Sequence, residues 1–158
     1  MDEIEKVLSV LELAVRGRCT AANEAELHTM SLTLLEKSSV EEVPPDMPDS
    51  SKTKMVNTAV LLHNKVRNLS TNGVYKEIKS IIRAASAWML SKYGQKTQKV
   101  LCTCIKLHTR CATELSSLKG DSVLLFSRRS LDEALANWEA LNIDALEQVK
   151  LLYYSILS

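Results

Sequence analysis

The sequence contains little glycine, proline or aromatic residue. Its 158 residues include only four glycines and three prolines, and aromatic residues make up 4%. β-Sandwiches and barrels need many tight turns, which glycine and proline form most easily, so this shortage excludes both classes. The chain is 46% hydrophobic and 25% charged, which also excludes a disordered or low-complexity protein. These numbers favour an all-α fold in a single domain spanning residues 1–158.

The sequence also lacks a long apolar run. The apolar runs at 60–62 and 123–126 are far shorter than the roughly 20 residues that cross a bilayer. The first six residues hold three acids and one lysine, whereas a secretory signal begins with a basic segment. We therefore expect a soluble protein that has no membrane partner.

Cysteine is present, but its spacing is not that of a disulfide framework. Three of the four cysteines fall within ten residues: Cys102, Cys104 and Cys111. This crowding predicts reduced thiols in the cytosol or nucleus. Cys104, His108 and Cys111 follow an i, i+4, i+7 spacing, which would place zinc ligands on one helical face. Because leucines share that face, we interpret the three as core residues and expect no cofactor; a zinc-stabilised module is the alternative.

Apolar residues recur with the period of an α-helix along most of the chain. The pattern predicts seven helices, over residues 2–17, 23–37, 52–69, 74–93, 97–118, 121–138 and 142–157. Asn23 and Glu26 resemble a capping box, and Gly94 is placed to end a helix in the left-handed conformation. Residues 38–51 hold all three prolines and four acids, and predict a flexible acidic loop.

The short turns between these segments make successive helices antiparallel neighbours. Two architectures remain open, a closed bundle and a solenoid of helical hairpins. Ser127, Leu131 and Ala134 match the spacing of the second helix in a tetratricopeptide hairpin, but the preceding helix lacks the matching pattern and the chain shows no exact 34-residue period. From the residues alone we expect antiparallel helical hairpins. The residues expected to be buried are Trp88, Trp138, Leu62, Ile82 and Leu131.

Charge is unevenly distributed along the chain. Residues 1–51 carry four basic and eleven acidic side chains. Residues 52–119 carry thirteen basic and two acidic side chains, and residues 120–158 carry three basic and six acidic ones. We call residues 52–119 the basic middle. Either it forms a surface for an acidic partner, or the acidic segments pack against it and neutralise its charge. The candidate partner-binding lysines are Lys92, Lys96 and Lys99. The alternative function is a nucleic-acid-binding helical domain using residues 52–119, which we do not favour because no aromatic side chain is interleaved with these cations.

The sequence contains no recognisable catalytic motif. Its three histidines are isolated from any arrangement typical of a nucleophile elbow or triad. No two of its four glycines are close enough to form a phosphate-binding loop. We therefore expect a protein without enzymatic activity and without a small-molecule substrate.

Three segments carry a resemblance to a known family. Residues 59–69 (AVLLHNKVRNL), 110–115 (RCATEL) and 134–141 (ALANWEAL) are similar to the amino-terminal part of the Zip-four/Spo-twenty-two family. The resemblance spans residues 55–145. It implies an irregular tetratricopeptide-like array that serves as a scaffold in the nucleus, on chromosomes, and binds other meiotic recombination and synapsis proteins to support crossover formation. Since family members are several times longer, it also implies that the chain is a fragment or short isoform.

The last predicted helix is apolar on nearly every side. Residues 149–157 (VKLLYYSIL) contain only Lys150 as a charge, whereas a terminal surface helix is normally half polar. We expect this helix to pack against the preceding one and to offer Leu152, Tyr153 and Ile156 to a further hairpin or to a partner chain. In the alternative interpretation, it passes through the centre of a closed bundle.

Overall fold

In the computed structural model, residues 2–71, 73–118, 121–141 and 150 are described. Within this part of the chain the secondary structure is helical, without strands, which confirms the all-α prediction. The helices are α1 (Asp2–Val15), α2 (Ala21–Val40), α3 (Asp49–Val66), α4 (Val74–Tyr93), α5 (Gln98–Ser116) and α6 (Asp121–Ala140). The seventh predicted helix lies, apart from Lys150, outside the described residues.

α2 begins earlier than its predicted start at Asn23. Thr20 is the N-cap: its hydroxyl accepts a hydrogen bond from the Asn23 backbone N–H at 3.1 Å, and the Asn23 side-chain oxygen accepts one from the Thr20 N–H at 3.2 Å. The reciprocal pair is a capping box that uses asparagine at its last position. Glu26, the predicted partner, therefore lies within the helix.

The loop between α2 and α3 is shorter than predicted, because serines do not end α2. The helix continues through Ser38 and Ser39 to Val40, and the Ser39 hydroxyl bonds to the Glu36 carbonyl at 3.1 Å. The prolines set the boundaries instead, since each lacks a backbone donor and restricts the residue before it. Pro48 is the N-cap of α3, so the connection occupies residues 41–48 instead of 38–51.

Gly94 ends α4, but the left-handed conformation predicted for it is wrong. Its φ is −73°, in the extended region. Glycine fits there for a steric reason: a Cβ atom on Gly94 would lie 2.5 Å from the Leu90 carbonyl oxygen. Gly17, after α1, does adopt the left-handed conformation, with a φ of +69°.

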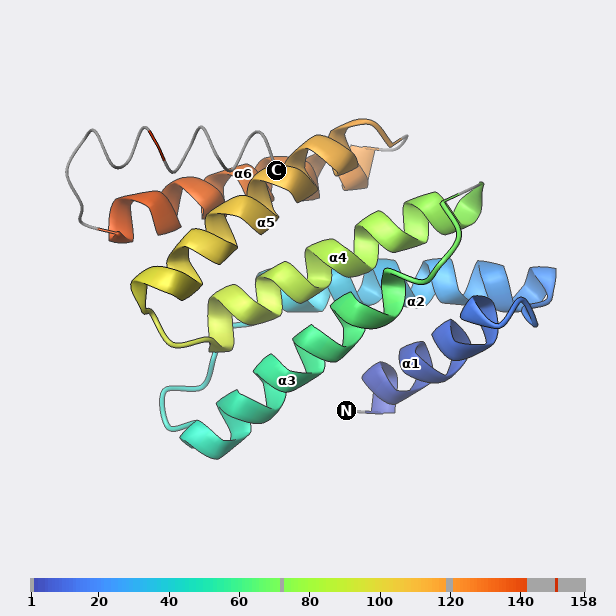
Figure 1. The fold of residues 1–158 in the computed structure, drawn as a ribbon, viewed down its shortest axis with the longest axis horizontal. Coiled ribbons are helices and arrows are strands. Elements are labelled where there is room, and N and C mark those ends of the chain that lie inside the picture. The colour runs from blue at the N-terminus through green and yellow to red at the C-terminus, as the bar shows by residue number, and fades with distance from the viewer. Residues whose placement is uncertain (1, 72, 119–120, 142–149, 151–158) are drawn as a thin grey trace.

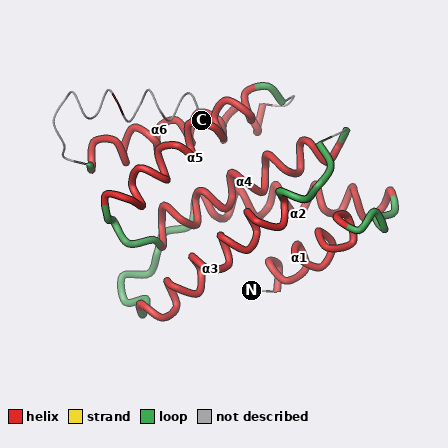
Figure 2. The backbone as a smooth tube through the Cα atoms, in the orientation of Figure 1, coloured by secondary structure: helices red, strands yellow, loops and turns green. Residues whose placement is uncertain are grey.

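α4 is the central helix of the structure. It contacts α2, α3 and α5, and Figure 1 shows it between α3 and α5 with α2 behind it. α6 packs mainly on α5 and touches α2, while α1 packs on α2 and α3. Figure 2 shows the short connections that join the helices at their ends. Because neighbours surround it, α4 is buried along most of its length.

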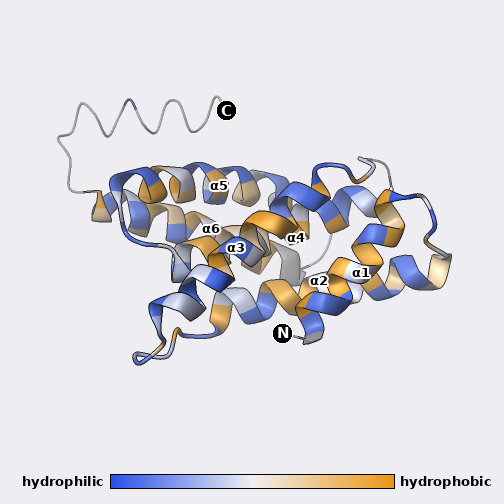
Figure 3. Cartoon of the chain, turned by 60° about the horizontal axis from the view of Figure 1, so that its bottom comes forward, coloured by the Kyte–Doolittle hydropathy of each residue, from blue (hydrophilic) through white to orange (hydrophobic). Residues whose placement is uncertain are grey.

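The main core lies where α1, α2, α3 and α4 meet. Figure 3 shows hydrophobic and hydrophilic positions mixed along each helix, as expected of helices that bury one side. The fully buried side chains of the main core include Leu11, Leu27, Leu35, Leu62, Ile81 and Ile82. Leu62, Ile82 and Trp88 are buried as predicted. A smaller cluster joins Leu101 and Ile105 of α5 to Leu141.

Two of the predicted core residues are not buried as expected. Leu131 is 49% exposed, and Trp138 is partly buried against the smaller cluster. α6 approaches α5 through its small side chains, including Ser127, Ser130 and Ala134, all of which are buried. Leu131 lies at the edge of this contact, where it lines an open cavity between α5 and α6, so its side chain stays about half exposed.

Candidate functional site

The three predicted partner-binding lysines lie around the end of α4 and the start of α5. Lys92 donates a hydrogen bond to the Glu41 carbonyl, and its ammonium lies 5.7 Å from the centre of the Trp88 ring. Lys96 donates to the Ser91 carbonyl, where it interacts favourably with the C-terminal end of α4. Lys99 is exposed on α5. Lys92 and Lys96 therefore each bond to a backbone carbonyl of this chain. The other predicted partner-binding residues, Leu152, Tyr153 and Ile156, lie outside the described residues.

Other cations of the basic middle converge on one cavity between α4 and α5. This basic pocket has a volume of about 480 Å³. It is lined by Thr71, Lys76, Lys79, Ser80, Arg83, Arg110, Glu114 and Ser117. Lys76, Lys79 and Arg83 follow an i, i+3, i+7 spacing and thus share one face of α4. That spacing was readable in the sequence, but the sequence did not show that Arg110 of α5 faces the same space.

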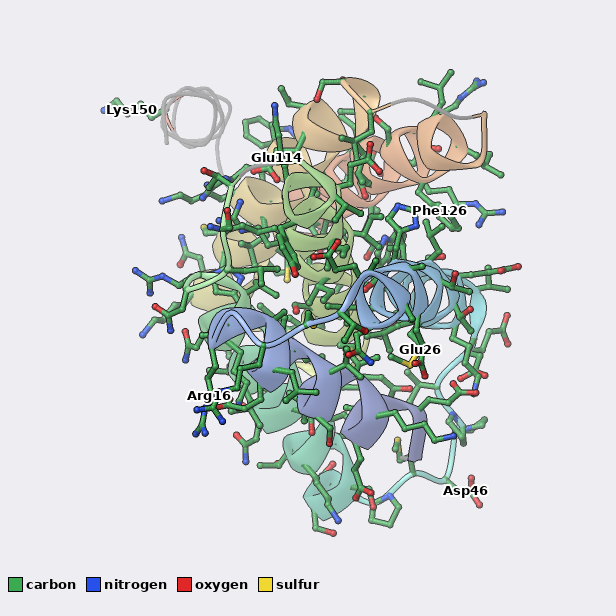
Figure 4. All side chains as sticks on the ribbon, turned by 90° about the vertical axis from the view of Figure 1, so that its right-hand side faces the viewer. Arg16, Glu26, Asp46, Glu114, Phe126 and Lys150 are labelled. Carbon is green, nitrogen blue, oxygen red and sulfur yellow. The ribbon has the colours of Figure 1, made fainter. Side chains whose placement is uncertain are left out.

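Glu114 holds the two arginines of the basic pocket side by side. Its carboxylate lies 2.9 Å from Arg110 Nε and 3.3 Å from Arg83 Nη1. Figure 4 labels Glu114 where α5 passes α4. Glu114 is the single acid among the residues lining the pocket, against four cations. The pocket therefore keeps an excess of positive charge.

Lys79 is buried beneath the basic pocket, with 8% of its surface exposed. Its ammonium lies within 3.3–3.5 Å of the Leu69 and Arg67 carbonyl oxygens, just beyond the end of α3. Burial lowers the pKa of Lys79, and the nearby Arg83 charge lowers it further. Burial also lowers the pKa of His63 on α3, and the nearby positive charges of Arg83, Arg67 and Arg110 lower it further. The positive potential of the pocket thus extends to α3.

The basic middle is only partly neutralised by acidic segments. Lys65 of α3 pairs with Glu12 of α1 at 2.6 Å, as expected if acidic helices pack against basic ones. Within the described residues, the acid that contacts Arg83 and Arg110 is Glu114, which belongs to the basic middle itself. The acidic segments therefore leave the cations of the basic pocket uncompensated.

A second candidate surface lies on α6. Four leucines of this helix, Leu124, Leu125, Leu131 and Leu135, are 48–58% exposed, and we call them the α6 leucine face. Leu124, Leu131 and Leu135 follow an i, i+7, i+11 spacing and form one stripe. Leu124, Leu125 and Leu131 line a cavity of about 690 Å³ between α5 and α6. Thr109, Ala112, Thr113 and Ser116 of α5 line the other side of this cavity.

The cysteine and histidine cluster belongs to the core. Cys104, His108 and Cys111 are at most 2% exposed, which confirms the prediction that they share a core face. His108 Nε2 lies 2.7 Å from the Ser91 hydroxyl, so the described structure pairs this nitrogen with a protein group. Burial lowers the pKa of His108 to about 3 and raises that of Cys111 to about 12. No group of three metal-ligating side chains occurs among the described residues.

The Ser91–His108 pair resembles part of a hydrolase site in composition only. Ser91 is 1% exposed and His108 has no exposed surface. A substrate could not reach either side chain without opening the contact between α4 and α5. The pair therefore satisfies the Ser91 hydroxyl and one ring nitrogen of His108 inside the core, while His108 Nδ1 has no hydrogen-bond partner among the described residues.

Comparisons with protein-family models, with curated proteins and with solved structures give no match for this chain. In the part of the chain that the structure describes, no helix combines the length and the apolarity needed to span a bilayer.

Proposed function

We propose that this chain is a non-enzymatic protein-binding module, built as an irregular tetratricopeptide-like array of antiparallel helical hairpins. Its α6 leucine face binds an amphipathic helix of a partner protein. The cellular setting proposed is the nucleus, on meiotic chromosomes, where the module would hold recombination and synapsis proteins together in crossover formation. That setting rests on the resemblance of residues 59–69, 110–115 and 134–141 to the meiotic scaffold family.

The observation that carries the proposal is the exposure of the α6 leucine face. Four large apolar side chains on one helix, each about half exposed, form a larger contiguous apolar surface than scattered single residues would. α4, by contrast, has helices packed around it. In a hairpin array, each helix buries its apolar side against the next, so an open apolar side is a place for another helix.

The geometry of the surface favours a helical occupant. Its stripe repeats with the period of a helix, and the adjoining cavity lies along the α5–α6 groove, as in helix-in-groove recognition. Arg128 lines this cavity between Leu124 and Leu131 and is exposed. A partner helix that places leucine-like residues on the stripe and an acid opposite Arg128 would satisfy both features.

Site-specific photo-crosslinking tests this proposal. A photoreactive residue at position 131 of the full chain should crosslink one dominant protein from meiotic nuclear extract, identified by mass spectrometry. The same residue at position 61 is the matched control, because Leu61 is 44% exposed but lies on α3. The identified protein is then purified, and its binding to the parent and to Leu131→Glu is compared.

The proposal expects the purified partner to bind the parent at least tenfold more tightly than Leu131→Glu, while Leu61→Glu binds like the parent. Equal binding to all three proteins would overturn the role of the α6 leucine face. A specific partner with no place on meiotic chromosomes would overturn the proposed setting but keep the binding surface.

A further inference from the structure

We propose that the groove between α4 and α5 binds a phosphorylated segment of a partner protein, with a phosphomonoester in the basic pocket and an apolar side chain in an adjoining apolar pocket. This site uses none of the α6 leucines. Its success or failure is therefore separable from that of the function proposed above.

The basic pocket has the charge that a phosphomonoester requires. A phosphorylated serine carries about −1.5 to −2 charges at pH 7 and three acceptor oxygens. Lys76, Lys79, Arg83 and Arg110 converge on the pocket, and Glu114 offsets one of their four charges. The hydroxyls of Ser80 and Ser117 line the same space but donate to nearby backbone carbonyls. Lys79 donates to the Arg67 and Leu69 carbonyls and adds positive charge to the pocket, so Lys76, Arg83 and Arg110 are the groups that remain to bind an anion.

The two arginines of the pocket keep unused donors. Glu114 engages one nitrogen of each guanidinium, Nη1 of Arg83 and Nε of Arg110. Arg83 Nε is buried and has no hydrogen-bond partner among the described residues. Because a buried donor without an acceptor is costly, an anion that reached it would be stabilised. The carboxylate of Glu114 also fixes both guanidinium groups before the ligand arrives, which reduces the entropy that binding costs.

An apolar pocket of about 200 Å³ continues the groove. Ala59, Val60, His63, Ser86, Leu90, Thr103 and Leu107 line it. Ser86 follows Arg83 by three residues on α4, and Leu107 precedes Arg110 by three on α5, so on both helices the two pockets are one turn apart. A short peptide can therefore reach both pockets at once.

This pairing favours a peptide over a nucleic acid. No Phe, Tyr or Trp side chain lines either pocket, so the large rings on which bases usually stack are missing from both linings. A nucleic-acid backbone carries one charge per phosphate and has no apolar side chain for the second pocket. A phosphorylated peptide supplies a dianion and an apolar side chain a few residues apart, which matches the basic and apolar pockets.

Fluorescence anisotropy on the full chain tests the inference. The probe is a labelled ten-residue peptide with one phosphoserine three residues from a leucine, measured beside its unphosphorylated form and a 20-base-pair duplex DNA at physiological salt. We expect the phosphorylated peptide to bind at least tenfold more tightly than the unphosphorylated one. Inorganic phosphate should compete only at far higher concentration, because it fills one pocket alone.

Variants locate the binding. Lys76→Gln and Arg110→Gln each change a side chain with exposed surface and should weaken the phosphopeptide at least fivefold. Lys54→Gln removes an exposed cation of α3 outside the pocket and should not change binding. Val60→Ser should abolish the advantage of the leucine-containing peptide over one with glycine in its place. Circular dichroism of each variant establishes that it is folded.

Three results would overturn the inference. Equal binding of the phosphorylated and unphosphorylated peptides would remove the phosphate site. Inorganic phosphate binding as tightly as the phosphopeptide would show that the site takes a small anion only. Duplex DNA binding more tightly than the phosphopeptide, and weakened by the same two substitutions, would assign the pocket to nucleic acid.

Discussion

At the residue scale, His108 is the most informative buried group. It has no exposed surface, its Nε2 lies 2.7 Å from the Ser91 hydroxyl, and the Trp88 ring meets it edge-on at 4.9 Å between ring centres. Burial lowers its pKa from 6.5 to about 3, since the charged imidazolium would lose its solvation. The folded protein therefore keeps this histidine neutral in a pH range where the unfolded chain protonates it.

This difference predicts a loss of stability in acid. Between pH 6.5 and about 3, the unfolded chain binds a proton that folded His108 does not, so the free energy of unfolding falls as the pH falls. The expected slope from this group is about 1.4 kcal/mol per pH unit. Urea denaturation of the parent and of His108→Gln between pH 7 and pH 4 isolates it. Parallel curves for the two proteins would show that His108 does not titrate differently on folding.

Gly17 and Gly94 end helices for different physical reasons, which asparagine substitution separates. Gly17 has a φ of +69° and open space where a Cβ would lie, and asparagine tolerates this conformation. Gly94 has an ordinary φ, but a Cβ would lie 2.5 Å from the Leu90 carbonyl oxygen. We expect Gly17→Asn to be nearly neutral and Gly94→Asn to cost about 1–3 kcal/mol by strain. Chemical denaturation measures both, and equal costs would contradict this assignment.

At the element scale, the α5–α6 contact depends on small buried side chains. Ser127 donates to the Ala112 carbonyl across this contact at 2.6 Å. Ser130 has no exposed surface, and its hydroxyl has no hydrogen-bond partner within the described residues. The two serines therefore make opposite contributions to the same interface.

Alanine at each serine measures this difference. Ser127→Ala removes a buried hydrogen bond between helices and should destabilise the protein by about 1 kcal/mol. Ser130→Ala removes a buried hydroxyl that has no hydrogen-bond partner within the described residues, so it should leave the stability unchanged or increase it. Each variant serves as the control for the other, because both delete one hydroxyl from α6. A shift of the denaturation midpoint in the same direction and by the same amount in both variants would contradict the assignment.

The helices themselves could be predicted from apolar periodicity, but not which sides they bury. Leu62 and Ile82 belong to stripes so apolar that any packing would bury them. The spacing of Ser127, Leu131 and Ala134 predicts a buried Leu131, yet α6 packs through small residues that let its backbone approach α5 and Leu131 is half exposed. The basic pocket could not be predicted for the same reason, because the sequence does not show which sides of α4 and α5 face each other. Only the packed structure shows that Arg110 lines the same pocket as the cations of α4.

At the scale of the whole molecule, charge and burial are organised around α4. Acidic α1 pairs with basic α3 through Glu12 and Lys65, while one side of α4 and α5 keeps its excess of cations. The apolar surface left open lies on α6, and its cavity shares no lining residue with the basic pocket, although α5 contributes to both. The molecule thus has two chemically distinct surfaces, one apolar and one basic, and these are the two surfaces proposed to bind partners.

The most direct test of the central claim, that the α6 leucine face binds a partner helix, is the dissociation constant of the purified crosslinked partner measured by calorimetry. The account predicts that Leu131→Glu combined with Leu135→Glu weakens binding at least a hundredfold while the denaturation midpoint stays near that of the parent, since both side chains are about half exposed. Unchanged affinity in this double variant, or loss of the folded state, would contradict it.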